Sequence, residues 1–124
     1  MTPAILPCDP SREYWFAEGC FILELSNSAD DPALSIARAR VLPGGVTRWH
    51  VLHDITERYV IERGTGVVEV GELPAQNVRP GDVVLIPPGC RQRIRNTGLD
   101  DLVFLALCTP RFVPEAYEDI DTAT

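Results

Sequence analysis

The sequence has few of the features that indicate a membrane protein, a disulfide-rich secreted domain or a zinc-binding module. No stretch approaches about 18 consecutive apolar residues, so no membrane-spanning helix is expected. Residues 1–10 also lack the basic and apolar regions of a signal peptide. The four cysteines have neither zinc-knuckle nor redox-motif spacing, which favours free thiols. We therefore predict a cytoplasmic protein, because thiols stay reduced in that compartment.

Positive charge is also scarce. Lysine and arginine together number 11 against 18 aspartates and glutamates, which gives a net charge of −7. A broad nucleic-acid-binding surface needs clustered basic side chains, so no nucleic-acid partner is expected. The one basic run, RQRIR at residues 91–95, alternates as a strand does. This alternation favours a strand that carries the basic side chains on one face, rather than an anion-binding site.

Long helical patterns, internal repeats and linkers are absent from the sequence. Eleven prolines and nine glycines divide the chain into short pieces. Most of these pieces have the composition or alternation of strands, namely residues 20–25, 33–42, 47–53, 57–63, 66–70, 82–86, 91–96 and 102–108. Residues 114–120 favour one helical turn that starts at Pro114. We predict a single all-β domain over residues 1–124, a sandwich or barrel of about nine to ten strands.

The chain contains only two histidines, His50 and His53, and Glu57 follows four residues after the second. Two imidazoles and a carboxylate so close together suggest a metal site. Side chains on a strand alternate between its faces, so His50 and Leu52 share one face and His53 points to the other. A β-bulge, or a position in the turn before Glu57, would bring His53 back inside. The sequence leaves both placements of His53 open.

Two ordered motifs give the most specific signal. The first cupin motif runs Gly, His, His, Glu, Gly, and residues 44–64 match its spacing at Gly44, His50, Glu57 and Gly64. The second runs Gly, Pro, Gly, His, Asn, and residues 81–96 match its spacing at Gly81, Pro87, Gly89 and Asn96. The chain therefore resembles a small single-domain cupin. The resemblance implies a double-stranded β-helix, or jelly-roll barrel, with a site in its interior.

The resemblance also implies a metal, because cupins use the histidines and glutamate of these motifs to hold iron, manganese, nickel, zinc or copper. In this chain, Leu52 and Gln92 stand at two of the four positions, and His50 and Glu57 remain. Gln92 can ligate weakly through its carbonyl oxygen or form hydrogen bonds to a bound molecule. The predicted metal ligands are therefore His50, Glu57 and Gln92, joined by His53 if it turns inward. As an alternative, Glu57 pairs with His50 or Arg48 in a structural polar cluster.

A barrel interior also predicts residues that line a pocket. Tyr59, Leu52, Ile94 and Phe104 are the candidates, and each has core packing as its alternative role. Arg38 would supply an anion site if it pointed inward. An outward Arg38 would belong to a solvated face together with Arg40.

The barrel mouth is a common ligand site, so we expect a small-molecule-binding protein that holds a divalent metal weakly, with Fe, Mn, Ni or Zn as candidates. Two alternatives stay open. One is a metal-dependent enzyme, an oxygenase or a protein similar to a sugar-phosphate isomerase; the other is a ligand-sensing module without catalysis. Fold alone does not choose among them. The resemblance implies a homodimer, with the apolar segments 20–25 and 102–108 as expected contact surfaces.

Overall fold

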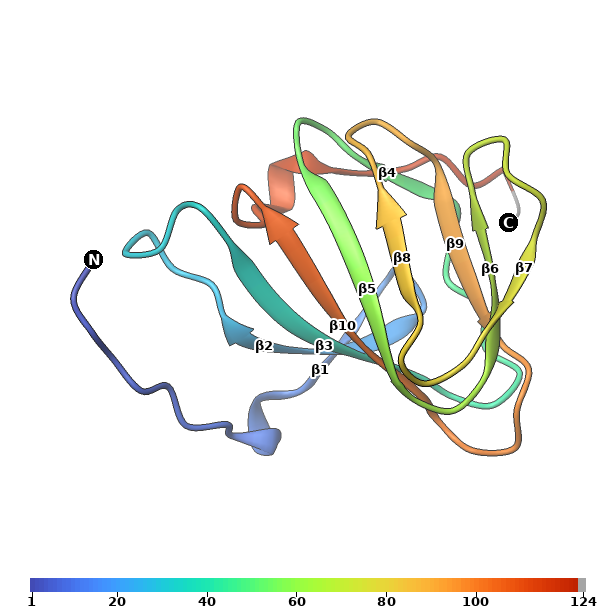
Figure 1. Cartoon of the computed structure of the whole chain (residues 1–124), viewed down its shortest axis with the longest axis horizontal. Helices are drawn as coiled ribbons and strands as arrows, with labels where there is room; N and C mark the ends of the chain where they lie inside the picture. The colour runs from blue at the N-terminus through green and yellow to red at the C-terminus, as the bar shows by residue number, and fades with distance from the viewer. Residues whose placement is uncertain (123–124) are drawn as a thin grey trace.

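Short antiparallel strands form nearly all of the regular secondary structure in the computed structural model, which is described over residues 1–122 (Figure 1). A six-stranded sheet has the order β1-β2-β3-β10-β5-β8, with the bounds Tyr14–Phe16, Cys20–Ser26, Ser35–Val41, Leu102–Thr109, Thr56–Arg63 and Val83–Ile86. A five-stranded sheet has the order β11-β4-β9-β6-β7, with the bounds Tyr117–Asp119, His50–Leu52, Gln92–Asn96, Gly66–Val70 and Gln76–Val78. The predicted all-β barrel of the double-stranded β-helix class is thus confirmed.

Alternation along the strands decides which side chains enter the interior. In β5, Glu57, Tyr59 and Ile61 are buried, and the residues between them are partly exposed. In β9, Gln92 and Ile94 are buried in the same way. A period of two is the geometry of a pleated strand with one face on the core. The strand interpretation of the basic run at residues 91–95 is therefore correct.

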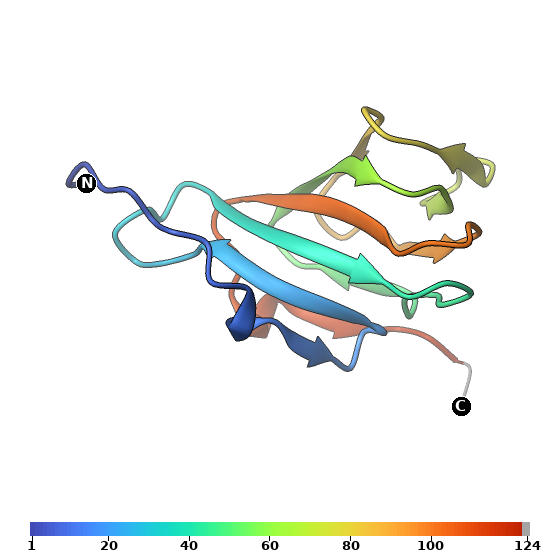
Figure 2. The ribbon, with the colours of Figure 1, turned by 90° about the horizontal axis from the view of Figure 1, so that it is seen from below.

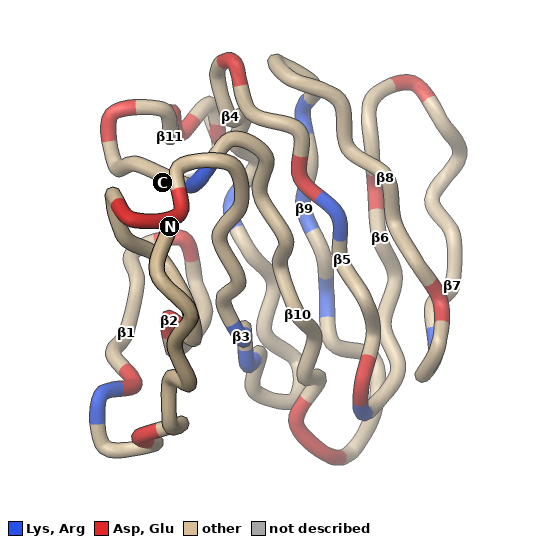
Figure 3. The backbone as a smooth tube through the Cα atoms, turned by 60° about the vertical axis from the view of Figure 1, so that its left-hand side comes forward, with Lys and Arg blue, Asp and Glu red and all other residues tan. Residues whose placement is uncertain are grey.

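The arginines of that run lie on the outer face of the five-stranded sheet, where Figure 3 shows basic residues along β9. The guanidinium groups of Arg91 and Arg93 lie 4.8 and 4.4 Å from the ring centre of Trp49. Arg93 also donates to Glu69 at 2.8 Å. These contacts cover the aromatic ring and partly neutralise the basic face.

Two groups of buried apolar side chains fill the space between the sheets. The larger contains Ile61, Ile94, Leu102 and Phe104, and the smaller contains Leu52 and its neighbours around Cys108. Burial of this apolar area is the main favourable contribution to folding. The turns that join the strands are tight. At Gly64, with φ +82°, an added Cβ would lie 2.6 Å from the carbonyl oxygen of Asp101, so only glycine fits there.

The eight predicted strand segments all contain strands, although that expected over residues 47–53 is shortened to His50–Leu52. Three further strands, β1, β7 and β11, were not predicted. The expected helical turn at Pro114 is the 3-10 helix η2, Pro114–Ala116, and β11 follows it directly. A second 3-10 helix, η1 (Pro10–Arg12), precedes β1. Among residues 1–122, no helix has the length and apolar character needed to cross a membrane.

Arg38 takes the outward of its two alternative placements, and one expectation about strand edges is corrected. Arg38 does not face the barrel interior: it lines an outer groove with Arg40, which pairs with Glu13 at 2.6 Å and Asp101 at 3.1 Å. The segments 20–25 and 102–108 lie in β2 and β10, which have a hydrogen-bonded neighbour on each side. They therefore offer no free edge to a second copy of the chain. Figure 2 shows the N-terminal residues extending beyond the strands.

Candidate functional site

A cavity of about 60 Å³ lies in the barrel interior. Its wall is mostly apolar and aromatic and includes Phe16, Ile22, Leu52, Ala106 and Phe112. A smaller set of polar side chains also lines it, namely Tyr14, Glu18, Glu24, Asn27, Ser35, His50, Glu57 and Tyr117. A mainly apolar cavity with a few convergent polar groups is the usual form of a small-molecule site.

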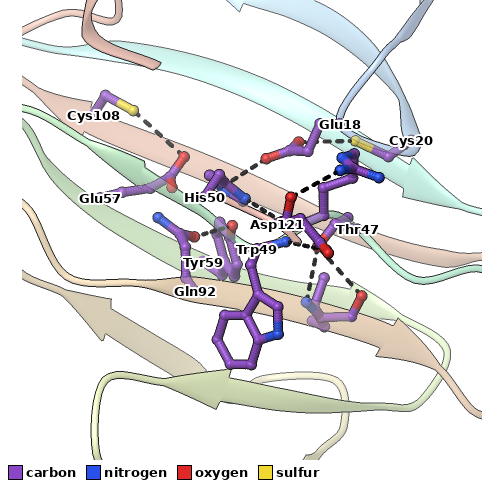
Figure 4. Close-up of polar contacts among 12 residues, drawn as sticks. Glu18, Cys20, Thr47, Trp49, His50, Glu57, Tyr59, Gln92, Cys108 and Asp121 are labelled. Atoms are coloured by element: carbon purple, nitrogen blue, oxygen red, sulfur yellow. Dashed lines mark hydrogen bonds and ion pairs between the residues drawn. The ribbon is translucent and has the colours of Figure 1, made fainter. Parts of the chain in front are cut away.

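His50 is held by contacts to both ring nitrogens. Its Nδ1 lies 2.7 Å from the carbonyl oxygen of Arg48, which can only accept, so Nδ1 carries a hydrogen. Its Nε2 lies 2.7 Å from Oε1 of Glu18 (Figure 4). The ring is 1% exposed and stacks on Tyr117, with 5.2 Å between the ring centres. These contacts fix the orientation of the imidazole and place a hydrogen on its Nδ1.

Glu18 lies in the turn between β1 and β2 of the six-stranded sheet, and its side chain contacts His50 on β4 of the other sheet. Its second oxygen accepts a hydrogen bond from the thiol of Cys20 at 3.2 Å. Burial opposes protonation of His50, but the negative charge of Glu18 and its hydrogen bond outweigh burial and raise the pKa of the imidazole. Nε2 and Oε1 at 2.7 Å therefore share one proton.

Glu57 lies at the start of β5 with its carboxyl group in the cavity wall. Its Oε2 accepts from the thiol of Cys108 at 3.6 Å, and its Oε1 has no hydrogen-bond partner among the described residues. Burial, followed by the negative charge of Glu18, raises the pKa of Glu57 from 4.5 to about 7. His50 and the nearby side chains of Gln92 and Cys108 act in the opposite direction. Glu57 thus changes its charge near neutral pH.

Gln92 is fully buried on β9, where its backbone pairs with that of His50 on β4. Its amide oxygen accepts a hydrogen bond from the hydroxyl of Tyr59. Its Nε2 has no partner among the described residues, and the same is true of the hydroxyl oxygen of Tyr117. Figure 4 shows the side chains of His50, Glu57 and Gln92 gathered in one region of the barrel interior. Buried polar atoms in native proteins nearly always have partners, so these unpartnered atoms distinguish this region from the rest of the interior.

The donor set does not fit the transition-metal centre that the motifs predict. Leu52 offers no ligand atom, Nε2 of His50 is engaged by Glu18, and the oxygen of Gln92 is engaged by Tyr59. Gln92 thus presents N–H groups to the site, and these cannot ligate a cation. Within residues 1–122, no group of three His, Cys, Asp or Glu side chains has the arrangement of a metal site. Of the four motif positions, only Glu57 has an oxygen without a hydrogen-bond partner among residues 1–122.

His53 lies outside the site, which corrects its inclusion among the predicted ligands. No bulge returns it to the interior: its side chain is 53% exposed, and its Nε2 contacts Glu118 at 2.7 Å. Its backbone N–H donates to the carbonyl of Ala116, outside β4. The simple alternation of the strand therefore holds through His53.

The predicted pocket residues divide between the cavity and the core. Leu52 lines the cavity. Ile94 and Phe104 instead belong to the larger apolar core, where Phe104 lies 4.4 Å from the ring centre of Tyr59. Tyr59 belongs to the same core and contributes its hydroxyl to Gln92. Ile94 and Phe104 thus fill the interior, and Tyr59 positions the amide of Gln92.

Sequence reasoning missed Glu18, Tyr117 and Cys108 as members of the site. Glu18 and Tyr117 lie far from both motifs, in segments whose pairing with β2 and β4 is determined by the tertiary fold. The available signal for Glu18 was an acidic residue within the otherwise apolar segment 14–23. Cys108 ends a predicted strand, and its inward side could have been inferred from alternation.

Comparison with known proteins places the chain among cupins. The family described as Cupin domain matches residues 37–108. None of the curated proteins matches the sequence. Among solved structures, Pac13 from Streptomyces, a nucleoside dehydratase, has a TM-score of 0.78 and 14% identity, with 98% of this chain and 95% of that chain covered.

Two further structures are similar over most of their length. A predicted oxalate decarboxylase from Thermotoga maritima has a TM-score of 0.72 and 25% identity, with 84% of this chain and 98% of that chain covered. A Klebsiella pneumoniae protein with a double-stranded β-helix domain has a TM-score of 0.72 and 13% identity, with coverages of 86% and 88%. At these identities the likeness concerns the fold, and function must be argued from the site.

Proposed function

Because the chain belongs to the cupin domain family, we propose that its barrel binds a small organic molecule in the cavity between the two sheets. The observation that carries the proposal is the pair of buried polar atoms in the cavity wall that lack partners, Oε1 of Glu57 and the hydroxyl of Tyr117. A buried polar group without a hydrogen bond costs roughly 1–3 kcal/mol. A bound molecule that supplies the missing partners offsets this cost.

The wall suggests how such a molecule is held. Phe16, Leu52 and Phe112 provide apolar surface, and Glu57 and Tyr117 provide hydrogen bonds that fix its orientation. The structural cluster considered from the sequence, in which Glu57 would pair with His50 or Arg48, is not formed. His50 pairs with Glu18 and Arg48 with Asp119, so Glu57 is left for the ligand.

Filling the cavity tests the proposal. Ala106 is buried in the cavity wall, so Ala106→Leu should occupy the space while it preserves the strand. In a thermal-shift screen against small polar and aromatic compounds, wild type should be stabilised by a subset of compounds and the variant by none of that subset. Ala75→Leu, in the exposed turn between β6 and β7, is the matched control and should respond as wild type does. Equal stabilisation of all three proteins would contradict binding in the cavity.

The contact between Glu18 and His50 supports a second candidate function, an enzyme that moves protons to and from the bound molecule. A carboxyl–imidazole pair at 2.7 Å beside a ligand cavity is suited to general acid–base catalysis. Such a group contributes about 10²–10⁴-fold to a rate. Proton transfer by this pair does not require a metal ion.

Hydrogen exchange tests the second candidate. A molecule identified by the thermal-shift screen is incubated with protein in deuterated water, and its proton signals are followed by NMR. An enzyme of this type should replace a carbon-bound proton by deuterium with wild type but not with His50→Gln. His53→Gln, which removes the exposed histidine, is the control and should behave as wild type. Retention of every carbon-bound proton with wild type would favour the ligand-sensing module.

A further inference from the structure

The cavity wall carries negative charge without a matching cation. Three glutamates and one histidine line it, namely Glu18, Glu24, Glu57 and His50. The chain contains no lysine, and no arginine among residues 1–122 lines the cavity. Every arginine side chain thus lies outside the wall, so His50 is its single basic group.

His50 does not neutralise the whole wall, because its possible positive charge is already matched by Glu18. Nδ1 of His50 carries a hydrogen because it faces the carbonyl oxygen of Arg48. One further proton lies between Nε2 and Oε1 of Glu18, which are 2.7 Å apart. Whether that proton resides on the imidazole or on the carboxyl group, the pair has no net charge. The charge of Glu57, when it is ionised, and that of the exposed Glu24 are therefore not balanced by a basic group of the wall.

Glu57 provides the specific contact point. Its side chain lines the cavity at 8% residual exposure, and its Oε1 has no partner. The thiol of Cys108, at 3.6 Å from Oε2, is a weak donor and brings no positive charge. A buried carboxylate is stable only when it is paired with a cation or with several donors. The side chains of Gln92 and Cys108 favour the ionised form of Glu57, but neither carries a positive charge. A cationic ligand would supply the charge that the wall lacks.

Aromatic rings surround the same space. Tyr14, Phe16, Phe112 and Tyr117 all line it, and the rings of Phe16 and Tyr117 are 5.0 Å apart. Aromatic faces attract organic cations, most strongly where water is excluded. The combination of a buried carboxylate with several rings is the chemistry of an ammonium-binding cavity.

We propose that the ligand of this cavity is a small organic cation, an amine or alkylammonium compound whose charged nitrogen lies against Glu57. The proposal rests on the function proposed above, namely that the cavity binds a small molecule. It also excludes a class of ligand: a dicarboxylate or a sugar phosphate would meet Glu57 and Glu24 with no arginine to receive it. The charge of the wall thus selects against the anionic substrates of a sugar-phosphate isomerase.

Three probes of nearly equal shape test the charge preference. They are choline, the uncharged 3,3-dimethylbutan-1-ol and the anionic 3,3-dimethylbutanoate, each titrated calorimetrically in the presence of EDTA. Choline should bind at least about tenfold more tightly than the alcohol, since a desolvated cation gains both the carboxylate and the rings. Butanoate should bind more weakly than either. Glu57→Gln should remove most of the preference for choline, whereas the exposed Glu62→Gln on the same strand should not.

The outcomes separate the two proposals. If the alcohol or the butanoate binds as well as choline, and Ala106→Leu abolishes that binding, the cavity is a ligand site and the inference of a cation is overturned. If no probe binds wild type, the inference of a cation also falls. If choline binds wild type and Ala106→Leu equally, the binding lies elsewhere and the cavity proposal itself fails. In a separate titration without EDTA, Glu57-dependent uptake of Zn(II) or Mn(II) by a protein that does not bind choline would equally overturn the inference.

Discussion

Replacing Glu57 by glutamine should stabilise the protein at about pH 8 and leave its stability nearly unchanged at about pH 4. Burial raises the pKa of Glu57 from 4.5 to about 7 in the folded protein. Between these values the folded state holds a proton that the unfolded chain has lost, so the free energy of unfolding falls as pH rises through this window. Above this pH window, the decrease in the free energy of unfolding has reached its full size. Glutamine does not ionise, and the variant avoids this decrease.

The magnitude follows from the pKa difference. A pKa difference of one corresponds to about 1.4 kcal/mol, so the rise from 4.5 to about 7 corresponds to about 3 kcal/mol. Urea unfolding, followed by the fluorescence of Trp15 and Trp49, measures the free energy of unfolding of both proteins at each pH. The advantage of the variant should grow by about 3 kcal/mol between about pH 4 and about pH 8.

Glu62→Gln is the control, because Glu62 lies on the same strand and is exposed. It should show no comparable change with pH, since an exposed carboxylate keeps its hydration in the folded state. If Glu57→Gln changed the free energy of unfolding by the same amount at both pH values, Glu57 would not be a buried ionisable group that lacks a charged partner. A variant that is less stable than wild type at about pH 8 would lead to the same conclusion.

Three further changes test other parts of the account. Leu52→His with Gln92→His should create nickel or zinc binding by adding two imidazoles beside His50, seen as a metal-dependent rise in melting temperature that wild type lacks; equal shifts would show that the two positions do not converge. Tyr59→Phe should cost about 1–3 kcal/mol in urea unfolding, because Gln92 loses its hydrogen-bond donor; an unchanged midpoint would contradict that contact. The chain should form a homodimer in light scattering, with Leu85→Glu monomeric because Leu85 is 68% exposed on the free edge strand β8; a 13.7 kDa species for wild type would refute dimerisation.

The sequence predicts the long strands well because their alternation is strong and glycine or proline bounds them. The three strands that it did not predict, β1, β7 and β11, have three residues each and lie at sheet edges. So short a segment carries too little pattern to indicate a strand. Its extended form depends on pairing with β2, β6 or β4, which is a property of the tertiary fold.

Alternation also predicts correctly that His50, Leu52 and Gln92 are buried, and of the two placements that the sequence leaves open for His53 the structure has the outward one. It could not predict that Glu18 engages His50, because Glu18 lies in a turn 32 residues earlier in the sequence and outside both motifs. The chemistry expected of His50 changes with that contact: a nitrogen predicted to ligate a metal shares a proton with a carboxyl group. Local pattern determines which residues are inside, and the topology determines which of them meet.

The most direct test of ligand binding in the barrel is methyl NMR of the protein titrated with a compound that stabilises it. The methyl groups of Ile22, Leu52 and Ala106 line the cavity, and those of Val83 and Leu85 are exposed on β8. We predict that the first group shifts with a common saturating dependence on ligand concentration and that the second does not. Shifts confined to Val83 and Leu85, with the cavity methyl groups unchanged, would contradict the account.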